Sequence, residues 1–479
     1  MSAPTTTKTY PCLIGGEMVT TAGTLEVINP ANEQVIATVP SCGKDELDRA
    51  VAAARTAFKT WRKTSPEERK KVVQGIAAAI KENADELFRL LTSEQGKPHA
   101  QAQQEIYGAA GLAAAQATLT LDDVINQDDD TRLSRTRRVP VGVVGGIVPW
   151  NFPVMMAIQK IVPALISGCT IVLKPSPFTP LTTLRIAELI RDVVPAGTVN
   201  IITGPDELGP LITEHPDIDK ITFTGSTATG KKIMEGASRD LKRITLELGG
   251  NDASIVLPDA DVEKVAEQLF WSSFSNAGQI CVAAKRIYIH EDIYDDLSKA
   301  IAEYAKGVTV GDGSHQGTGV GPIQNKKQFD RVCELIQDAK DNGYQFLVGG
   351  EVDPSGSGYY VPITILDNPP EDARIVAEEQ FGPVMPLMKF SSVDEVIARA
   401  NASEYGLAGA VWTKDTDQGV AIAEQLETGT VWINEFLHIS PFAPFGGHKQ
   451  SGFGAEYGTE GLKEFTYPQV ITVKRDAMV

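Results

Sequence analysis

The sequence is poor in residues that bind metals or form disulfide frameworks. It has five cysteines among 479 residues, widely spaced and odd in number, and six scattered histidines. No C-x-x-C, H-x-H or H-E-x-x-H pair occurs, and such pairs are the usual signature of zinc and disulfide sites. We therefore predict no metal cofactor. The scattered cysteines also indicate a reducing compartment, and we expect a cytoplasmic protein.

Long apolar runs and an excess of positive charge are also lacking. No stretch of about 18 apolar residues is present, and the first residues contain no apolar segment of the kind found in export signals. Lys and Arg total 44 against 62 for Asp and Glu, a net charge of −18. This sign disfavours nucleic acids and membrane surfaces as partners, although backbone amides can still form a local anion site.

The composition itself is that of an ordinary globular protein, with 42% hydrophobic and 22% charged residues. From residue 141 onward, short apolar segments alternate with amphipathic ones, which is typical of strands and helices around a parallel sheet. The alternation pauses at Gly249-Gly250 and then resumes. The sequence therefore predicts an α/β protein with two doubly wound α/β domains. A basic, extended segment at 132–140 predicts a protruding ribbon or linker.

Segments at two predicted strand ends could hold a phosphate. In Phe-Thr-Gly-Ser-Thr-Ala-Thr-Gly (223–230), the first glycine precedes a predicted helix, whose N-terminal amides can bind anions. Lys174 ends another predicted strand, at the edge where open α/β sheets bind ligands. Each signal alone has an ordinary alternative, a structural turn or a solvent-facing lysine.

Three polar residues are candidates for catalysis. Cys281 follows a polar, flexible run (276–279), Glu247 lies within an apolar run, and Asn151 stands at a strand-to-helix junction. A buried carboxylate has a raised pKa that suits a general base, and an amide can stabilise an oxyanion. The alternatives are an inert buried cysteine and a helix cap at Asn151. The nearest histidine, His290, gives no local support for a Cys–His pair.

Seven motifs along the chain combine into one specific pattern. They are 149–153 (Pro-Trp-Asn-Phe-Pro), Lys174, 223–230, 247–250 (Glu-Leu-Gly-Gly), 278–281 (Gly-Gln-Ile-Cys), 378–383 (Glu-Glu-Gln-Phe-Gly-Pro) and 444–447 (Pro-Phe-Gly-Gly). In this order and at this spacing, the sequence resembles the aldehyde dehydrogenase superfamily over essentially its whole length. It resembles in particular the NAD(P)-dependent, hydrolytic, non-acylating type, because CoA-acylating relatives typically lack the glutamate at 247.

This resemblance implies oxidation of an aldehyde to a carboxylic acid by a covalent mechanism. Cys281 would attack the aldehyde to give a hemithioacetal, whose oxyanion the Asn151 amide would hold. Glu247 would activate the water that hydrolyses the resulting thioester, and Lys160 and Glu456 would relay the proton outward. The alternatives are a semialdehyde dehydrogenase, a CoA-acylating dehydrogenase, and a structural or binding protein on the same fold.

The resemblance also implies a Rossmann-like cofactor-binding domain at 1–118 and 141–249. Its cofactor would be NAD, with NADP as the alternative, because Pro177 replaces the glutamate with which many NAD-preferring relatives repel a 2′-phosphate. The implied cofactor-binding residues are Ile147, Pro149, Trp150, Lys174, Ser176, Pro177, Thr224, Gly225, Ser226, Gly230, Leu248, Glu379 and Phe381.

The implied catalytic domain spans 250–458 and lines a mostly apolar substrate pocket. Without an arginine to pair with a substrate carboxylate, this pocket favours a medium aliphatic or aromatic aldehyde. Its residues by position are Phe152, Met155, Met156, Gln159, Ile280, Val282, Ile439 and Phe445. The segments 119–140 and 459–479 correspond to the family's small β oligomerisation ribbon, and strands left unpaired at an edge favour association. We therefore expect a homodimer or a homotetramer.

Overall fold

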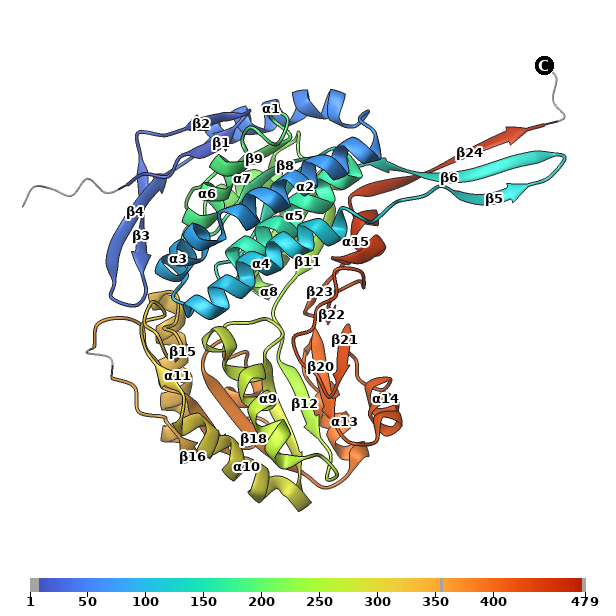
Figure 1. Cartoon of the computed structure of the whole chain (residues 1–479). Coiled ribbons are helices and arrows are strands. Elements are labelled where there is room, and N and C mark those ends of the chain that lie inside the picture. The colour runs from blue at the N-terminus through green and yellow to red at the C-terminus, as the bar shows by residue number, and fades with distance from the viewer. Residues whose placement is uncertain (1–7, 354–355, 476–479) are drawn as a thin grey trace, which may run out of the picture.

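The alternation of apolar strands and amphipathic helices forms two large sheets with helices packed around them (Figure 1). The computed structural model describes residues 8–353 and 356–475. The outermost parts of the predicted segments 1–118 and 459–479 (1–7 and 476–479) therefore lie outside the described residues. The predicted α/β fold class is confirmed. The boundaries 1–118, 141–249 and 250–458 stay a prediction.

The first sheet has a parallel centre with antiparallel strands at both edges, β1 against β9 and β23 against β11. Its central strands are buried, because helices cover both faces. In spatial order the strands are β2 (Glu17–Val19), β1 (Cys12–Ile14), β9 (Val199–Ile201), β8 (Thr170–Lys174), β7 (Val143–Ile147), β10 (Lys220–Thr224), β11 (Arg243–Glu247) and β23 (Gly452–Phe453).

The helices of this first body follow their local sequence signals. At the start of α2, for example, Ser65 and Glu68 form the capping box that their spacing predicts. The helices are α1 (Lys44–Trp61), α2 (Pro66–Glu82), α3 (Ala84–Gln95), α4 (His99–Gln116), α5 (Pro153–Ser167), α6 (Leu181–Ile190), α7 (Leu208–Glu214) and α8 (Thr227–Ser238). A hairpin of β3 (Thr24–Asn29) and β4 (Gln34–Pro40) accompanies them.

The second sheet is parallel except for its edge strand β16. In spatial order its strands are β16 (Gln345–Val348), β17 (Thr364–Asp367), β18 (Val384–Phe390), β13 (Ala284–His290), β12 (Asp252–Val256), β20 (Ala408–Trp412) and β21 (Thr430–Ile433). Around it lie α9 (Val262–Phe274), the 3-10 turn η1 (Ser275–Gly278), α10 (Glu291–Lys306), α11 (Lys326–Asp341), α12 (Arg374–Ala377), α13 (Val393–Asn401) and α14 (Thr416–Ala423). Short strand pairs are β14 (Thr309–Val310) with β15 (Thr318–Val320), and β19 (Tyr405–Gly406) with β22 (His448–Lys449).

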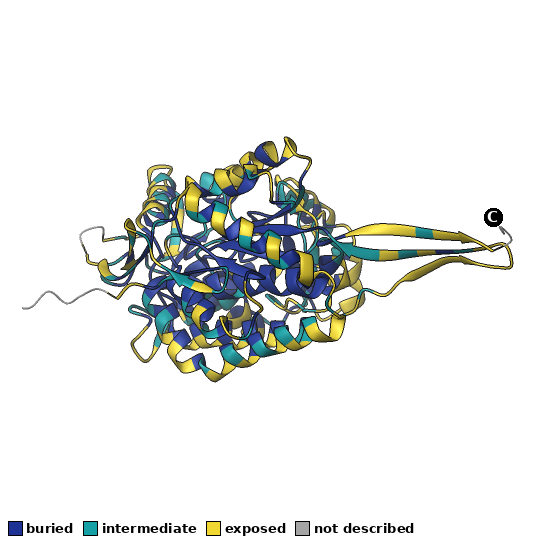
Figure 2. Cartoon of the chain, turned by 90° about the horizontal axis from the view of Figure 1, so that it is seen from above, coloured by how far each residue is buried: buried dark blue, intermediate teal, exposed yellow. Residues whose placement is uncertain are grey.

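A separate antiparallel ribbon projects from the first body (Figures 1 and 2). Strand β6 (Arg132–Pro140) lies between β5 (Val124–Asp128) and β24 (Thr466–Lys474), which the short helix α15 (Gly458–Lys463) precedes. Figure 2 shows most of this ribbon exposed, in contrast to the buried strands of the body. The ribbon thus joins two segments that are far apart in the sequence. No helix in the described part of the chain is long and apolar enough to span a membrane.

Candidate active site

The predicted site residues of the first body lie at one edge of its sheet. In the parallel ladders Ile147 pairs with Lys174, Phe223 with Ile147, and Thr224 with Glu247. Strands β7, β8, β10 and β11 therefore end in register at their carboxyl ends, where open α/β sheets bind ligands.

A cleft of about 1480 Å³ runs along this edge and continues against loops of the second body. Most of the predicted site residues line it. They are Ile147, Pro149, Trp150, Asn151, Phe152, Met155, Met156, Lys174, Ser176, Pro177, Thr224, Gly225, Ser226, Glu247, Leu248, Ile280, Cys281, Val282, Glu379, Phe381 and Ile439. The most distant of these residues are more than 250 positions apart in the sequence, and folding brings them to one cleft.

The loop before Cys281 has a constrained backbone. Asn276, Ala277 and Gly278 have φ values of 52°, 55° and 72°, a left-handed conformation that is costly for residues other than glycine. At Gly278 a Cβ atom would lie 2.1 Å from the carbonyl oxygen of Gly382, so this close approach requires glycine. Such strain persists only where the surrounding structure fixes it. This loop conformation places the half-buried Cys281 at the cleft.

Asn151 is oriented toward the Cys281 loop and does not cap the following helix. Its Nδ2 donates to the carbonyl oxygen of Gln279 at 3.0 Å. The first amides of α5, at Val154 and Met155, donate instead to Oε1 of Glu105 at 2.9 and 3.1 Å. The helix-cap alternative for Asn151 is therefore wrong. Its side-chain amide lies in the cleft, 6% exposed.

A buried ion pair behind this junction had no signal in the sequence. Lys97 Nζ lies 2.5 Å from Glu105 Oε2, and both side chains are fully buried. The same ammonium donates to the carbonyl oxygen of Asn151 at 2.9 Å and lies 3.8 Å from the centroid of the Phe152 ring. Lys97 and Glu105 thus fix the main chain at Asn151 and at the start of α5. Lys97 and Asn151 are 54 positions apart in the sequence.

The electrostatic environment of Glu247 suits a proton acceptor. Burial raises its pKa to about 8, the negative charge of Glu456 acts in the same direction, and the charge of Lys160 opposes them. Lys160 and Glu456 form a buried ion pair with each other. Oε1 of Glu247 is buried and has no hydrogen-bond partner. A carboxylate in this state can accept a proton near neutral pH.

Cys281 and Glu247 influence each other directly. Burial raises the pKa of the Cys281 thiol well above its usual range, and the charge of Glu247 raises it further. The positive charge of Lys285 acts in the opposite direction. A thiol in this environment ionises more easily when Glu247 takes its proton, because the carboxylate charge that opposes the thiolate is then removed.

Glu379 and Phe381 face the same floor of the cleft. Oε1 of Glu379 accepts from the amide of Gly250 at 3.1 Å and lies 3.2 Å from Nζ of Lys285. Phe381 adopts φ 50° and packs edge-to-face against Trp150, with 5.4 Å between ring centroids. Glu379 is therefore tied to the segment that follows Glu247.

The other end of the cleft carries charged side chains. Burial lowers the pKa of Lys174 to about 8, and the negative charges of Asp206 and Glu207 oppose that shift. Ser226 caps helix α8, its Oγ accepting from the amide of Thr229 at 3.3 Å. Asp206 and Glu207 line the cleft and are exposed.

Some predicted residues lie just behind the cleft wall. Gln159 and Phe445 both contact Tyr457, whose hydroxyl donates to Gln159 Oε1 at 2.9 Å and whose ring packs edge-to-face with Phe445. Tyr457 itself lines the cleft. Gly230 faces Leu248, since a Cβ there would lie 2.6 Å from Leu248 Cδ2. Lys160 and Glu456, as an ion pair, also lie behind the wall.

Sequence reasoning missed several residues that line or support the cleft. Helix α4 contributes Gly108, Gly111 and Leu112, and a distant loop contributes Leu437 and Pro441. The two glycines could have been noticed in the sequence. Glycines three positions apart inside a helix weaken that helix, and at these positions they do not cap it. Tyr457, Lys97 and Lys285 left no such signal.

A doubly wound sheet whose strand ends border a long cleft, with a thiol beside a buried carboxylate, is typical of cysteine-dependent oxidoreductases that bind a nucleotide. The family model described as "Aldehyde dehydrogenase family" matches residues 18–471. A probable aldehyde dehydrogenase of a Pseudomonas species is 43% identical over 97% of this chain and 95% of its own. The phenylacetaldehyde dehydrogenase of Pseudomonas fluorescens is 39% identical over 97% and 96%.

Among solved structures, the NAD+ complex of the aldehyde dehydrogenase from Bacillus cereus superimposes with a TM-score of 0.95 at 39% identity, covering 98% of this chain and 97% of the other. The chain belongs to the aldehyde dehydrogenase family. The predicted family and the predicted class of activity, oxidation of an aldehyde by an NAD(P)-dependent dehydrogenase, are thus confirmed.

Proposed function

We propose that this enzyme uses Cys281 as nucleophile and Glu247 as general base to convert an aldehyde to the carboxylic acid. The observation that carries this proposal is the juxtaposition of the Cys281 thiol, the buried Glu247 carboxylate and the Asn151 amide on one floor of the cleft. No histidine is among the residues described as lining this cleft, so the carboxylate takes the part of the base.

The steps follow from these groups. Glu247 accepts the thiol proton, and the Cys281 sulfur adds to the aldehyde carbonyl carbon. The resulting oxyanion is held by the Asn151 side-chain amide and the Cys281 backbone N–H. A bound NAD+ would supply the acceptor for the hydride that leaves this carbon, so that a thioester would remain on Cys281. Glu247 passes the thiol proton to the Lys160–Glu456 pair, which relays it away. The regenerated carboxylate then takes a proton from water, which attacks the thioester and releases the acid and the Cys281 thiolate.

The residues along the cleft fit a dinucleotide. The hydroxyl of Thr224 is buried without a partner and lines the cleft, as does Glu247, so both can interact with a group bound between them. Lys174 and the start of helix α8 would hold the adenosine ribose and the pyrophosphate, and Glu379 would bind the nicotinamide ribose.

We favour NAD over NADP. Pro177 cannot repel a 2′-phosphate, but Asp206 and Glu207 place two carboxylates at the same end of the cleft as Lys174. Carboxylates near the ribose disfavour a phosphate there. The solved NAD+ complex of the Bacillus cereus relative is consistent with this choice.

The substrate is a medium aliphatic or aromatic aldehyde. Apart from the carboxylates of Glu247 and Glu379, the cleft around Cys281 is lined by uncharged side chains, from α4, the start of α5, the loop at 280–282, the loop at 437–441 and Tyr457. At Gly111, a Cβ would meet nothing within 4 Å, so α4 leaves room for a bulky group. A semialdehyde would need a cation at this wall. The phenylacetaldehyde dehydrogenase among the relatives acts on an aromatic aldehyde, as its name states.

The ribbon supports assembly into a homodimer or homotetramer, and the scattered cysteines support a cytoplasmic location. Its outer strands β5 and β24 carry exposed apolar side chains, among them Val124 and Val470, each 61% exposed. Open strand edges with apolar side chains favour pairing with a second copy. Light scattering on the purified chain gives the assembly mass. A monomer at micromolar concentration would contradict this part of the proposal.

The central experiment is Cys281→Ala. Loss of the sulfur should abolish aldehyde-dependent formation of reduced cofactor, while titration with NAD+ shows unchanged binding, because only the covalent step is removed. A variant that still turns over at the wild-type rate would refute the assignment. Turnover that depends strongly on coenzyme A would favour the acylating alternative, and a wild type that reduces no cofactor with any aldehyde would favour a binding protein.

A further inference from the structure

Lys285 is a buried cation directly beneath the proposed active site. It is the second residue of β13 and is 2% exposed. Its Nζ donates to the carbonyl oxygen of Cys281 at 2.6 Å and lies 3.2 Å from Oε1 of Glu379. Within the described chain Lys285 is not one of the residues that line the cleft. It therefore acts on the site from behind.

The contacts of Lys285 join three segments that come from distant parts of the sequence. Glu379, besides its contact with Lys285, accepts from the amide of Gly250, three residues beyond Glu247. At Gly249, a Cβ would lie 2.5 Å from Oε2 of Glu379, so the carboxylate fits closely against this turn. One ammonium group thus connects the loop of the nucleophile, the turn after the base and the loop of Glu379.

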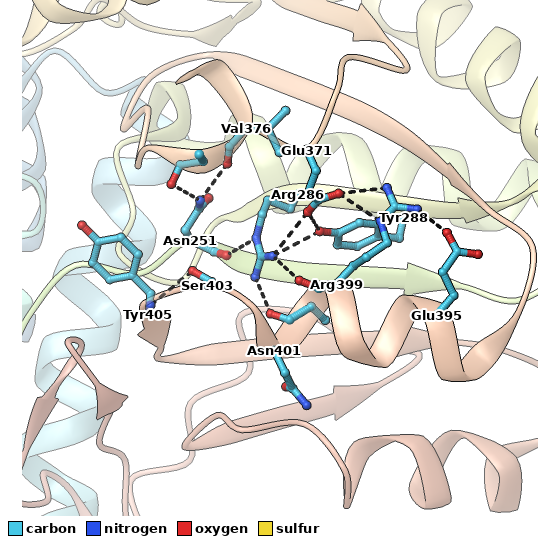
Figure 3. A network of polar contacts seen from close by, with 12 residues as sticks. Asn251, Arg286, Tyr288, Glu371, Val376, Glu395, Arg399, Asn401, Ser403 and Tyr405 are labelled. Carbon is cyan, nitrogen blue, oxygen red and sulfur yellow. Dashed lines mark hydrogen bonds and ion pairs between the residues drawn. The ribbon is translucent and has the colours of Figure 1, made fainter. Parts of the chain in front are cut away.

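The main chain at Lys285 is also held through its neighbour Arg286, whose polar contacts Figure 3 shows. Successive side chains of a strand point to opposite faces, and Arg286 enters a buried polar network. Its Nε donates to the carbonyl oxygen of Asn251 at 2.7 Å, and its terminal nitrogens donate to the carbonyl oxygens of Arg399 and Ala400 at 3.2 and 2.9 Å. Asn251 Nδ2 in turn donates to the carbonyl oxygen of Val376 at 2.8 Å. Lys285 therefore extends from a rigid base.

The charge of Lys285 is also placed where it matters for the thiol. The titratable groups that act on Cys281 are Glu247 from β11, Glu379 from the loop after α12, and Lys285 from β13, while Tyr457 faces the same floor. Of the three, only Lys285 lowers the pKa of the thiol. An ammonium group that lacked these partners would be costly to bury.

We propose that Lys285 is a positioning residue that ties the Glu379 carboxylate to the main chain of Cys281. This proposal rests on the proposed function for its consequence, which is that the nicotinamide end of the cofactor and the nucleophile stay in register. The positive charge also favours the thiolate form of Cys281. A purely structural lysine would satisfy the same carbonyl oxygen but would affect neither cofactor affinity nor thiol ionisation.

The test compares K285M and K285R with a matched control, K242M. Lys242 is another buried lysine whose Nζ donates to main-chain carbonyl oxygens, those of His215 and Ile218 at 2.5 and 2.8 Å, and it is not among the described residues that line the cleft. The first measurement is the rate at which iodoacetamide alkylates Cys281 in the cofactor-free enzyme at fixed pH values between 7 and 9, followed by mass spectrometry. Below the pKa of the thiol this rate is proportional to the thiolate fraction, so in K285M it should fall about tenfold or more.

The second measurement compares the change in the KM for NAD+ with the changes in kcat and in the KM for the aldehyde. K285M should raise the KM for NAD+ about tenfold, with a smaller change in the KM for the aldehyde, and K285R should restore both measurements toward wild type. K285Q keeps a donor without the charge and replaces K285M if that variant does not fold. A folded variant without the charge that matches K242M in both measurements would overturn the proposal.

The two proposals fail in distinguishable ways. If the wild type reduces no NAD+ with any aldehyde, the proposed function is wrong, and the alkylation profile alone then decides the role of Lys285. If the wild type is active and K285M matches K242M both in the alkylation rate and in the KM for NAD+, only the role of Lys285 is wrong.

Discussion

The two ends of the cleft differ in how they hold their charged groups. At the inner end, around Cys281, the carboxylates of Glu247 and Glu105 and the ammonium groups of Lys97 and Lys285 are buried. At the outer end Lys174 is also buried, but the acids that act on it, Asp206 and Glu207, are exposed. Buried charges are costly unless partners fix them, so the inner end is built from close contacts. The outer end faces solvent, and its exposed charges can discriminate between NAD and NADP without being held in a rigid geometry.

The largest effect is expected from breaking the buried pair at the inner end. Lys97→Met leaves Glu105 as an uncompensated buried charge, and loss of one partner of such a pair costs about 3–5 kcal/mol. The midpoint of thermal unfolding should therefore fall by many degrees, and the double variant K97M/E105Q should recover part of the loss. Asp206→Asn at the outer end should leave the midpoint unchanged, and equal falls for the two single variants would contradict the comparison.

The next effect concerns the base. Glu247→Gln should slow hydrolysis of the thioester more than acylation, because the Cys281 thiol can also lose its proton to solvent whereas water needs a base to attack. The expected result is a burst of reduced cofactor followed by a steady state that is slower by about 100-fold. In the wild type the steady-state rate should rise with pH through about 8, where the carboxyl group ionises. In E247Q this rise should be absent. Stopped-flow absorbance of the reduced cofactor measures both, and an unchanged steady state would assign water activation to another group.

The raised pKa of Glu247 also has a consequence for stability. Because burial raises this pKa from 4.5 to about 8, its contribution to stability is fully present below 4.5 and is lost as the pH rises through about 8. The unfolding midpoint of E247Q relative to wild type should therefore rise between pH 5 and pH 9. A difference that is independent of pH over this interval would be inconsistent with the burial of the carboxylate.

A smaller effect is expected at the apolar wall of the inner end. Gly111→Leu places a branched side chain where a Cβ now meets open space. The kcat/KM for phenylacetaldehyde should fall about tenfold or more, while that for acetaldehyde changes little, since steric exclusion of a few carbon atoms has about this value. Gly111→Ala serves as the control and should keep both values. Equal losses for the two aldehydes in G111L would remove α4 from the substrate pocket.

The smallest effect is expected at the outer end. The double variant D206N/E207Q removes two exposed charges and should raise the ratio of kcat/KM for NADP to that for NAD by a few-fold, since screening by solvent weakens them. Pro177→Glu should lower the same ratio. Activity with saturating NAD should stay at the wild-type value in both. If neither change alters this ratio, the 2′-hydroxyl of the adenosine ribose does not lie near Pro177, Asp206 and Glu207.

Local patterns in the sequence predicted the elements that carry the site. Strands β7, β8 and β10 and helices α5 and α8 follow from apolar runs, glycines and periodicity within short windows. The apolar run around Glu247 forms strand β11, which places the carboxylate at the carboxyl end of a parallel strand. These predictions succeeded because the periodicity of a strand or helix is a property of neighbouring residues.

The residues that sequence reasoning missed act through contacts between distant segments. Lys97 reaches Asn151 across 54 positions, and Gln159 reaches Tyr457 across 298. Gln159 and Phe445, predicted as pocket residues, lie behind the cleft wall and contact Tyr457. No motif indicated this contact. Side-chain direction at such positions depends on how the elements pack.

By itself, the sequence determined the α/β class, the order of the strand-end motifs and the identity of the thiol, the carboxylate and the amide as candidates. Only the tertiary structure decided that Glu105, rather than Asn151, caps helix α5, that Gly111 opens the cleft, and that Lys285 lies between Cys281 and Glu379. The physical reason is that a residue type fixes what chemistry a side chain can perform. Its burial and its partners, which set its pKa and its direction, exist only once distant segments have packed together.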